Sequence, residues 1–253
     1  MQEHETLYMK VKPSDVAEYV IFSGDPWRVE TVKDMLEQPR HINFCREFNT
    51  YTGTYKGVRI TVSSTGIGAP SAAIAMEEMA ASGMKTAIRM GTIMALRDDL
   101  LGKFIIPAGA MRKESASVTY APLSYPAIAD MRVVACMNRA AAANGRGYDN
   151  GITCSMDGFY SQMRRSETSD RLGICVDDTF TELRKYGIVG VDMESSLILT
   201  LGRLMGISAG VVCMTTVLEN LKQVLAGRER TEAEEILCRT ALDGIVQMEE
   251  SKR

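Results

Sequence analysis

The segment YVIFSGDPWRVETVKDM, residues 19–35, passes from a short β-rich run through a glycine turn into a helical pattern. The apolar run at 19–23 predicts a buried strand, and Gly24 marks its end. Pro26 suits the first turn of a helix, which we expect over 27–35. This order of strand, turn and helix predicts one unit of an α/β sheet, in which ligands bind beyond the carboxyl ends of strands.

The same alternation continues along the chain. We expect strands at 19–23, 50–55, 58–64, 86–90, 104–107, 152–155, 188–191 and 209–215. We expect helices at 27–35, 69–82, 130–144, 179–186, 194–205 and 231–249. The pattern predicts an α/β fold with a mostly parallel or mixed sheet flanked by helices. No linker or internal repeat divides the sequence, so a single domain over 1–253 is expected.

Charge and composition narrow the functional class. The 253 residues are 45% hydrophobic and 24% charged, which is typical of a folded globular protein. Lys and Arg number 29 against 32 Asp and Glu, for a net charge of −3. Such a balance argues against binding to a nucleic-acid backbone or an anionic membrane. An anionic ligand would have to be met by a few well-placed residues.

Cysteine and histidine content argues against a metal centre. The six cysteines form no CxxC pair, and only two histidines accompany them, so neither a zinc site nor a catalytic metal is expected. The first residues, MQEHETLYMK, contain no apolar core of a signal peptide. A reducing cytoplasm is therefore the expected location.

Three further junctions between strand and helix or at a strand end carry polar or flexible residues: STGIGAPS at 64–71, RMGT at 89–92 and VDMES at 191–195. Arg89 lies in an otherwise apolar strand, where a charge is costly unless it has a counterpart. Asp192 and Glu194 stand at the start of a helix. Taken singly, such an arginine is usually on the surface, and such acids often only complement the helix dipole. Together the junctions predict a polar site at one edge of the sheet.

Seven segments carry a family resemblance: GDPWRVE, CREFNTYTGTYKG, STGIGAPSAAIAMEE, IRMGT, YAPLSYPAIAD, SMDGFY and VDMESSLILT. With them the chain resembles the uridine phosphorylase branch of the nucleoside phosphorylase family, from about residue 8 to residue 248. The resemblance implies a three-layer αβα domain whose central mixed, twisted sheet is partly barrel-like. It also implies reversible phosphorolysis of a nucleoside to a free base and ribose 1-phosphate, with inorganic phosphate as co-substrate and no cofactor. Family members are homo-oligomers, at least dimers and commonly hexamers.

The resemblance also assigns residues to the two substrates and to a cation. The phosphate positions are Gly24, Arg28, Arg89, Thr92 and Arg46, the last reaching the site of a neighbouring subunit. The ribose positions are Met193, Glu194 and Tyr8, which stands where the family has a histidine and has His4 as a rival. The base positions are Phe159, Gln162 and Arg164, or Met163 and Arg165 if no gap is placed before the pair. A monovalent cation such as K⁺ is expected at the dimer interface on Glu47, Ile67 and Ser71.

Several residues depart from the family pattern near the base. Ile93 and Met94 replace a small hydroxyl residue and a glycine, and Glu219 stands where an arginine is usual. The first interpretation is a pyrimidine nucleoside phosphorylase that acts on uridine. The second is an impaired or non-catalytic paralogue that binds phosphate or nucleoside, or serves as a partner subunit. A purine nucleoside phosphorylase is a lesser alternative, because an apolar residue replaces the aspartate of that branch.

Overall fold

The computed structural model describes residues 4–252 and contains one mixed sheet. Its main path runs β2-β3-β4-β1-β5-β11-β10-β7-β8, while β12 joins β5 to β6, and β9 pairs with β6. The strands are β1 (Tyr19–Ser23), β2 (Glu37–Cys45), β3 (Phe48–Tyr55), β4 (Val58–Ser64), β5 (Thr86–Ala95), β6 (Phe104–Ile105), β7 (Gly109–Lys113), β8 (Ala127–Ile128), β9 (Tyr148–Asp149), β10 (Thr153–Met156), β11 (Gly190–Asp192) and β12 (Ser208–Leu218).

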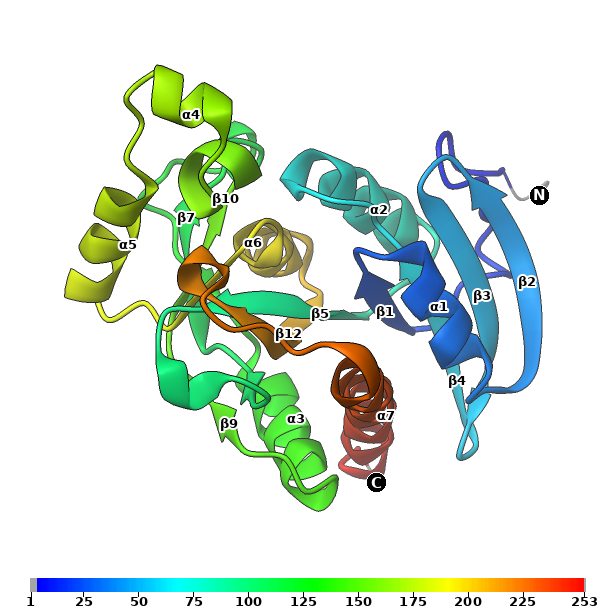
Figure 1. Ribbon diagram of the computed structural model, residues 1–253. Coiled ribbons are helices and arrows are strands. Elements are labelled where there is room, and N and C mark those ends of the chain that lie inside the picture. The colour runs from blue at the N-terminus through cyan, green and yellow to red at the C-terminus, as the bar shows by residue number, and fades with distance from the viewer. Residues whose placement is uncertain (1–3, 253) are drawn as a thin grey trace.

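Helices cover both faces of this sheet (Figure 1). On one face α2 packs on α6, and on the other α3 and α1 pack on α7. The helices are α1 (Pro26–Lys33), α2 (Ala69–Ala81), α3 (Met131–Ala143), α4 (Glu167–Arg171), α5 (Val176–Lys185), α6 (Ser195–Met205) and α7 (Gly227–Glu250), with short turns η1 (Asp98–Leu100), η2 (Ser117–Thr119), η3 (Phe159–Met163) and η4 (Glu219–Leu221). The predicted sheet flanked by helices is therefore confirmed.

Strand β5 lies at the centre of the sheet and pairs with β1, β11 and β12. Its first half runs parallel to β1 and β12, and its end pairs antiparallel with β11, where Val191 faces Met94. The strand predicted at 86–90 continues to Ala95, because β11 and β12 take up the backbone hydrogen bonds of its second half. β1 lies between β4 and β5 and runs parallel to both, so the glycine junctions that follow β1 and β4 meet at one edge.

Elements that were not predicted are mostly short or polar. β2 is largely exposed and pairs with β3 as a hairpin, so its sequence lacks the apolar alternation of a half-buried strand. α4 spans five residues and begins with a capping box at Ser166. α5 begins at Val176 rather than 179. Such differences at element ends reflect local capping that hydrophobic periodicity does not report.

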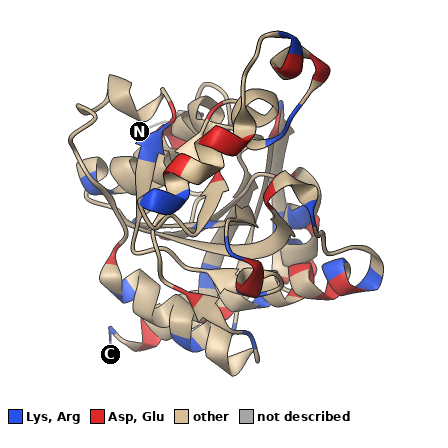
Figure 2. Ribbon diagram, turned by 60° about the vertical axis from the view of Figure 1, so that its left-hand side comes forward, with Lys and Arg blue, Asp and Glu red and all other residues tan. Residues whose placement is uncertain are grey.

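The core falls into two clusters. The larger joins the sheet to α2, α3, α6 and α7. The smaller contains Met94, Met163, Phe180, Leu183 and Val191 and lies among β5, β11, η3 and α5. Figure 2 shows basic and acidic residues dispersed over the helices. Within 4–252, no helix is long and apolar enough to cross a membrane.

Candidate functional site

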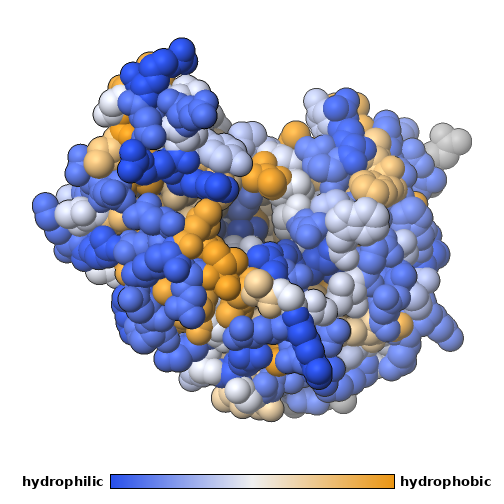
Figure 3. Space-filling model, in the orientation of Figure 1, coloured by the Kyte–Doolittle hydropathy of each residue, from blue (hydrophilic) through white to orange (hydrophobic). Residues whose placement is uncertain are grey.

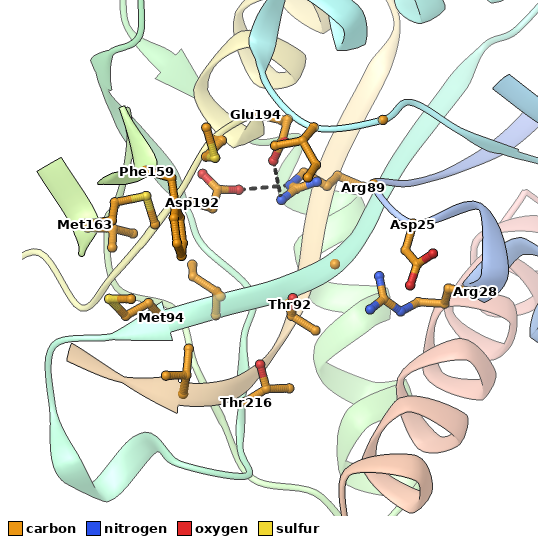
Figure 4. A pocket seen from close by; sticks show the side chains of 18 of the residues that line it. Asp25, Arg28, Arg89, Thr92, Met94, Phe159, Met163, Asp192, Glu194 and Thr216 are labelled. Atoms are coloured by element: carbon orange, nitrogen blue, oxygen red, sulfur yellow. Dashed lines mark hydrogen bonds and ion pairs between the residues drawn. The ribbon is translucent and has the colours of Figure 1, made fainter. Parts of the chain in front are cut away.

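A cavity of about 900 Å³ opens at the edge of the sheet where β1, β5 and β11 end. In Figure 3 it appears as a hollow, with hydrophobic residues along the wall on the α5 side. Figure 4 shows its two ends, one with Arg28 and Arg89 and the other with Phe159, Met94 and Met163. A concave site with an apolar wall and convergent polar groups is typical of small-ligand binding.

Arg89 is held between two carboxylates. Its Nη2 atom lies 2.6 Å from Oε2 of Glu194, and its Nε donates to Oδ2 of Asp192 at 2.9 Å. All three side chains are almost completely buried. Gly91 lies two residues along β5, and a Cβ there would come within 3.2 Å of the guanidinium carbon. Glycine at this position therefore leaves the room in which the ion-pair cluster forms.

Burial and charge set the protonation of the cluster. Burial alone would lower the pKa of Arg89, but Glu194 and Asp192 raise it above its ordinary value, so the guanidinium stays charged. Burial raises the pKa of Glu194 above its ordinary value, and Arg89 opposes that shift. The site thus holds a permanent cation beside a carboxyl that takes up a proton more readily than an exposed one.

Two serines fix Asp192. Ser155 Oγ donates to Asp192 Oδ1 at 2.7 Å, and Ser195 Oγ donates to Oδ2. The Ser195 backbone N–H also donates to the same carboxylate. Both carboxylate oxygens of Asp192 therefore already accept hydrogen bonds, and the carboxylate holds Arg89 in place.

Glu194 joins two junctions of the sheet. Its Oε1 accepts a hydrogen bond of 2.6 Å from the Gly68 N–H, while Oε2 faces Arg89. Gly68 has a φ of +99°, a conformation that side chains other than glycine rarely adopt. The STGIGAPS junction thus contributes a backbone donor that orients the Glu194 carboxylate.

Arg28 supplies a second buried cation. It stands on α1, whose N-cap Asp25 accepts from the Trp27 N–H at 2.9 Å. Its Nη1 donates to Ser23 Oγ at 3.2 Å, and Nη2 lies 3.4 Å from Glu234 Oε1. Its buried Nε finds no partner among the described residues. An anion in the cavity would bind at the end where Arg28 lies.

Arg230 on α7 is a third arginine at the cavity, and it was not predicted. Arg230 lines the cavity, and its Nε donates at 3.0 Å to Oε1 of Glu234, the same oxygen that faces Arg28. The carboxylate therefore bridges two arginines at the charged end. The sequence signal was available, because residues four apart on a helix face each other and 230 and 234 have opposite charges.

The opposite end of the cavity is apolar. We call Met94, Phe159, Met163, Val217 and Leu221 the apolar end; all five line the cavity and belong to or pack against the smaller core cluster. Ile93 also lines the cavity. Val217, Leu221 and Met163 were not predicted as base contacts in the preferred alignment. They come from a β-bulge in β12, from η4 and from η3, which periodicity does not locate.

Seven of the residues predicted to bind phosphate, ribose or base line the cavity. These are Gly24, Arg28, Arg89, Thr92, Phe159, Met193 and Glu194. The structure does not bring Gln162 or Arg164 there. Gln162 Oε1 accepts from the N–H of Gly158, the N-cap residue of η3, at 2.8 Å, and the exposed Arg164 lies over the ring of Tyr160.

Neither Arg165 nor Glu219 lines the cavity. Arg165 is exposed and pairs with Asp170. The charge of Glu219 does not face the cavity, since it pairs with Arg184 and Lys222. The negative charge of Glu219, where the family usually has an arginine, is therefore neutralised by these two cations outside the cavity.

Tyr8 and Arg46 lie together and neither lines the cavity. The Arg46 guanidinium stands 5.3 Å from the centre of the Tyr8 ring. Arg46 is exposed in the tight turn between β2 and β3, with a φ of +56°. His4, the rival to Tyr8, is exposed at the start of the described chain.

Two of the three predicted cation ligands meet. Ser71 Oγ donates to Glu47 Oε1 at 2.7 Å. The side chain of Ile67 is 78% exposed at the cavity mouth, so only its main-chain carbonyl has the chemistry of a cation ligand. A carboxylate and a hydroxyl oxygen suit a hard cation.

Comparison with known proteins places this geometry in a family. A model described as the phosphorylase superfamily matches residues 18–242. A uridine phosphorylase of Thermococcus kodakarensis is 39% identical over 213 residues, which cover 84% of this chain and 77% of that protein. The crystal structure of uridine phosphorylase from Vibrio fischeri ES114 superposes with a TM-score of 0.83 at 30% identity, covering 98% of this chain and 99% of the other. That of purine nucleoside phosphorylase from Toxoplasma gondii, in complex with immucillin-H, gives 0.83 at 26% identity and 99% of both chains.

Proposed function

The chain belongs to the phosphorylase superfamily, and we propose that it is a pentosyltransferase that catalyses reversible phosphorolysis of a pyrimidine nucleoside, uridine, to free base and ribose 1-phosphate. One observation carries the proposal: Arg89 and Arg28 face one end of a cavity, Glu194 stands between the ends, and the other end is apolar. A phosphate dianion, a sugar and a flat base would each find a matching environment.

The mechanism follows from this arrangement. A phosphate oxygen forms a bond to C1′ of the ribose as the bond between C1′ and N1 of the base breaks. The electron pair of that bond stays on the base, which then takes a proton from water. The arginines hold phosphate so that its negative charge stabilises the positive charge developing on the sugar. Ionised Glu194 accepts hydrogen bonds from the ribose hydroxyls, while Phe159 packs against base and sugar.

Base release from uridine, thymidine, 2′-deoxyuridine, inosine and adenosine, with and without phosphate, tests the activity. We expect phosphate-dependent release from uridine. Turnover of no pyrimidine nucleoside at high enzyme concentration would contradict the proposal and favour a non-catalytic paralogue. Faster release from inosine than from uridine would instead assign the purine activity. Neither alternative is favoured by the relatives at 39% and 32% identity, because both are uridine phosphorylases.

A dimer would complete the site. Tyr8 and Arg46 have the chemistry expected at the ribose and phosphate but lie outside their own cavity, so they would serve that of a second copy. Subunits carrying Arg46→Ala and Arg89→Ala would each be nearly inactive. Unfolded together and refolded as a mixture, they should regain about a quarter of the wild-type sites, because half of the dimers would contain one intact site. No recovery on mixing would contradict a shared site.

The cation site belongs to the same interface. Glu47 and Ser71 would hold K⁺ or another monovalent cation through oxygen atoms. Thermal unfolding in potassium against tetramethylammonium chloride tests this, with Glu47→Gln as the variant. We expect K⁺ to raise the unfolding temperature of the wild type only; an equal rise in the variant would argue against the site.

A further inference from the structure

The η4 segment turns its polar side chains away from the cavity. Glu219 pairs with Arg184 on α5, and Asn220 Nδ2 donates to Asp177 Oδ1 at 2.7 Å, also on α5. Lys222 pairs with Asp98 on η1. Each polar group of this segment is therefore satisfied on the outer side.

Leu221 is the residue of this segment that lines the cavity. Its φ is +55°, in the left-handed region that leucine disfavours and asparagine tolerates. Strained backbone that persists at a ligand site points to a role for the side chain that it presents. Here the strained residue presents an isobutyl group, rather than an amide, to the cavity.

The other side chains of the apolar end are, like Leu221, without strong hydrogen-bonding groups. Met94, Phe159, Met163 and Val217 bring thioether, aromatic and aliphatic surface, and none has a hydrogen-bonding group able to pair with a pyrimidine edge. Figure 4 shows Phe159, Met94 and Met163 together at the end opposite Arg28. Tyr160 stands at the rim, 59% exposed and edge-on to Phe159.

We propose that the apolar end holds the base by shape and dispersion, and that none of its side chains reads the N3 edge of the pyrimidine. The substrate class is then wider than uridine and includes pyrimidine nucleosides alkylated at N3. This inference rests on the proposed function for its reaction, but it concerns the base contact alone. It agrees with Gln162 and Arg164 being held elsewhere by Gly158 and Tyr160.

Comparison of uridine with 3-methyluridine tests the inference, since the methyl group removes the N3–H donor and leaves N1 and the ribose unchanged. A site built to hydrogen-bond a substrate group rejects an analogue that lacks it by about 10⁴–10⁵ in kcat/KM, whereas an apolar pocket discriminates by about 10–200-fold for a methylene. We expect the ratio of kcat/KM for uridine to that for 3-methyluridine, at saturating phosphate, to stay below about 200. A larger ratio overturns the inference.

Three variants extend the test. Leu221→Asn relieves the backbone strain and brings an amide to the wall, so it should fold and should raise the uridine to 3-methyluridine ratio at least about tenfold. Arg164→Ala should leave that ratio unaltered, as should Arg165→Ala beside it. A collapse of the ratio toward one in Arg164→Ala alone would show that this arginine reads the edge, and would overturn the inference.

Binding separates this inference from the proposed reaction. Calorimetry with uracil and 3-methyluracil, added to phosphate-saturated protein, needs no turnover. We expect dissociation constants within about tenfold of each other, because a methyl group in an apolar pocket changes affinity by little more than that. Binding of uracil with no measurable binding of 3-methyluracil would overturn the inference. Absent turnover with matched binding would contradict only the reaction.

Discussion

The Arg89 guanidinium lies 2.6 Å from the Glu194 carboxylate, so the group expected to bind phosphate is already paired with the group expected to bind ribose. The same guanidinium contacts Asp192, which two serines hold. A phosphate entering the cavity would share Arg89 with Glu194 rather than meet a free cation. The two substrates would thus be coupled through one buried ion pair.

Arg89→Ala should damage both activity and stability. Removing the cation leaves two buried carboxylates without their partner, which costs about 3–5 kcal/mol in the free energy of unfolding. Urea unfolding measures this loss, and the assay with uridine should show almost no base release. The matched control is Arg97→Ala, whose exposed pairs with Asp99 and Asp149 contribute at most about 1 kcal/mol. Equal losses in the two variants would show that the buried cluster is not a stabilising unit.

Glu194 should set an acid limb in the pH profile. Its raised pKa means that it gains a proton above the ordinary value of 4.5, and the protonated form no longer pairs with Arg89. We expect kcat/KM to fall on the acid side with an inflection above 4.5. Glu194→Gln should lower the plateau by about 10²–10³ and abolish that inflection. An unchanged acid limb in the variant would assign it to another group.

The raised pKa of Glu194 also determines how the free energy of unfolding changes with pH. Between pH 4.5 and the raised pKa, the folded protein binds more protons at Glu194 than the unfolded chain does. The contribution of this group to the free energy of unfolding therefore falls as pH rises through that window. Urea titrations of wild type and Glu194→Gln across the window should differ in slope in that direction.

Glu234→Gln should tighten phosphate binding. The carboxylate bridges Arg28 and Arg230, and its charge opposes that of an incoming anion. Neutralising it should lower the KM for phosphate about threefold, an effect that shrinks as salt screens the charge. Glu235→Gln, one residue along and exposed, is the control and should leave that KM unchanged. A rise in KM for Glu234→Gln would mean that the bridge positions Arg28 more than it competes with phosphate.

Met94→Ala tests whether this side chain belongs to the core as well as to the cavity. Met94 is 3% exposed and packs in the smaller cluster, so its truncation should cost about 2–5 kcal/mol in the free energy of unfolding. Met131→Ala, at a side chain that is 59% exposed, should change it by no more than about 0.5 kcal/mol. A small loss for Met94→Ala would place its side chain in the ligand space instead.

The sequence by itself determined the alternation of strands and helices and the junctions that carry polar groups, because both are local. Periodicity reports burial of one face, and glycine or proline reports a turn. The family motifs also identified Arg28, Arg89 and Glu194, which the structure brings to one cavity. β2 and α4 escaped prediction, since an exposed hairpin strand and a five-residue helix leave no apolar pattern.

Only the tertiary structure decided what each polar group faces. The sequence offered Gln162, Arg164 and Glu219 as groups near the base, yet backbone turns and partners on α5 direct all three elsewhere. It gave no sign that Leu221 would replace them, because its place depends on two successive residues of positive φ and on a bulge in β12. The direction of a side chain depends on contacts distant in sequence. The motifs therefore predicted the residues of the charged end, but only the tertiary structure showed which residues form the apolar end.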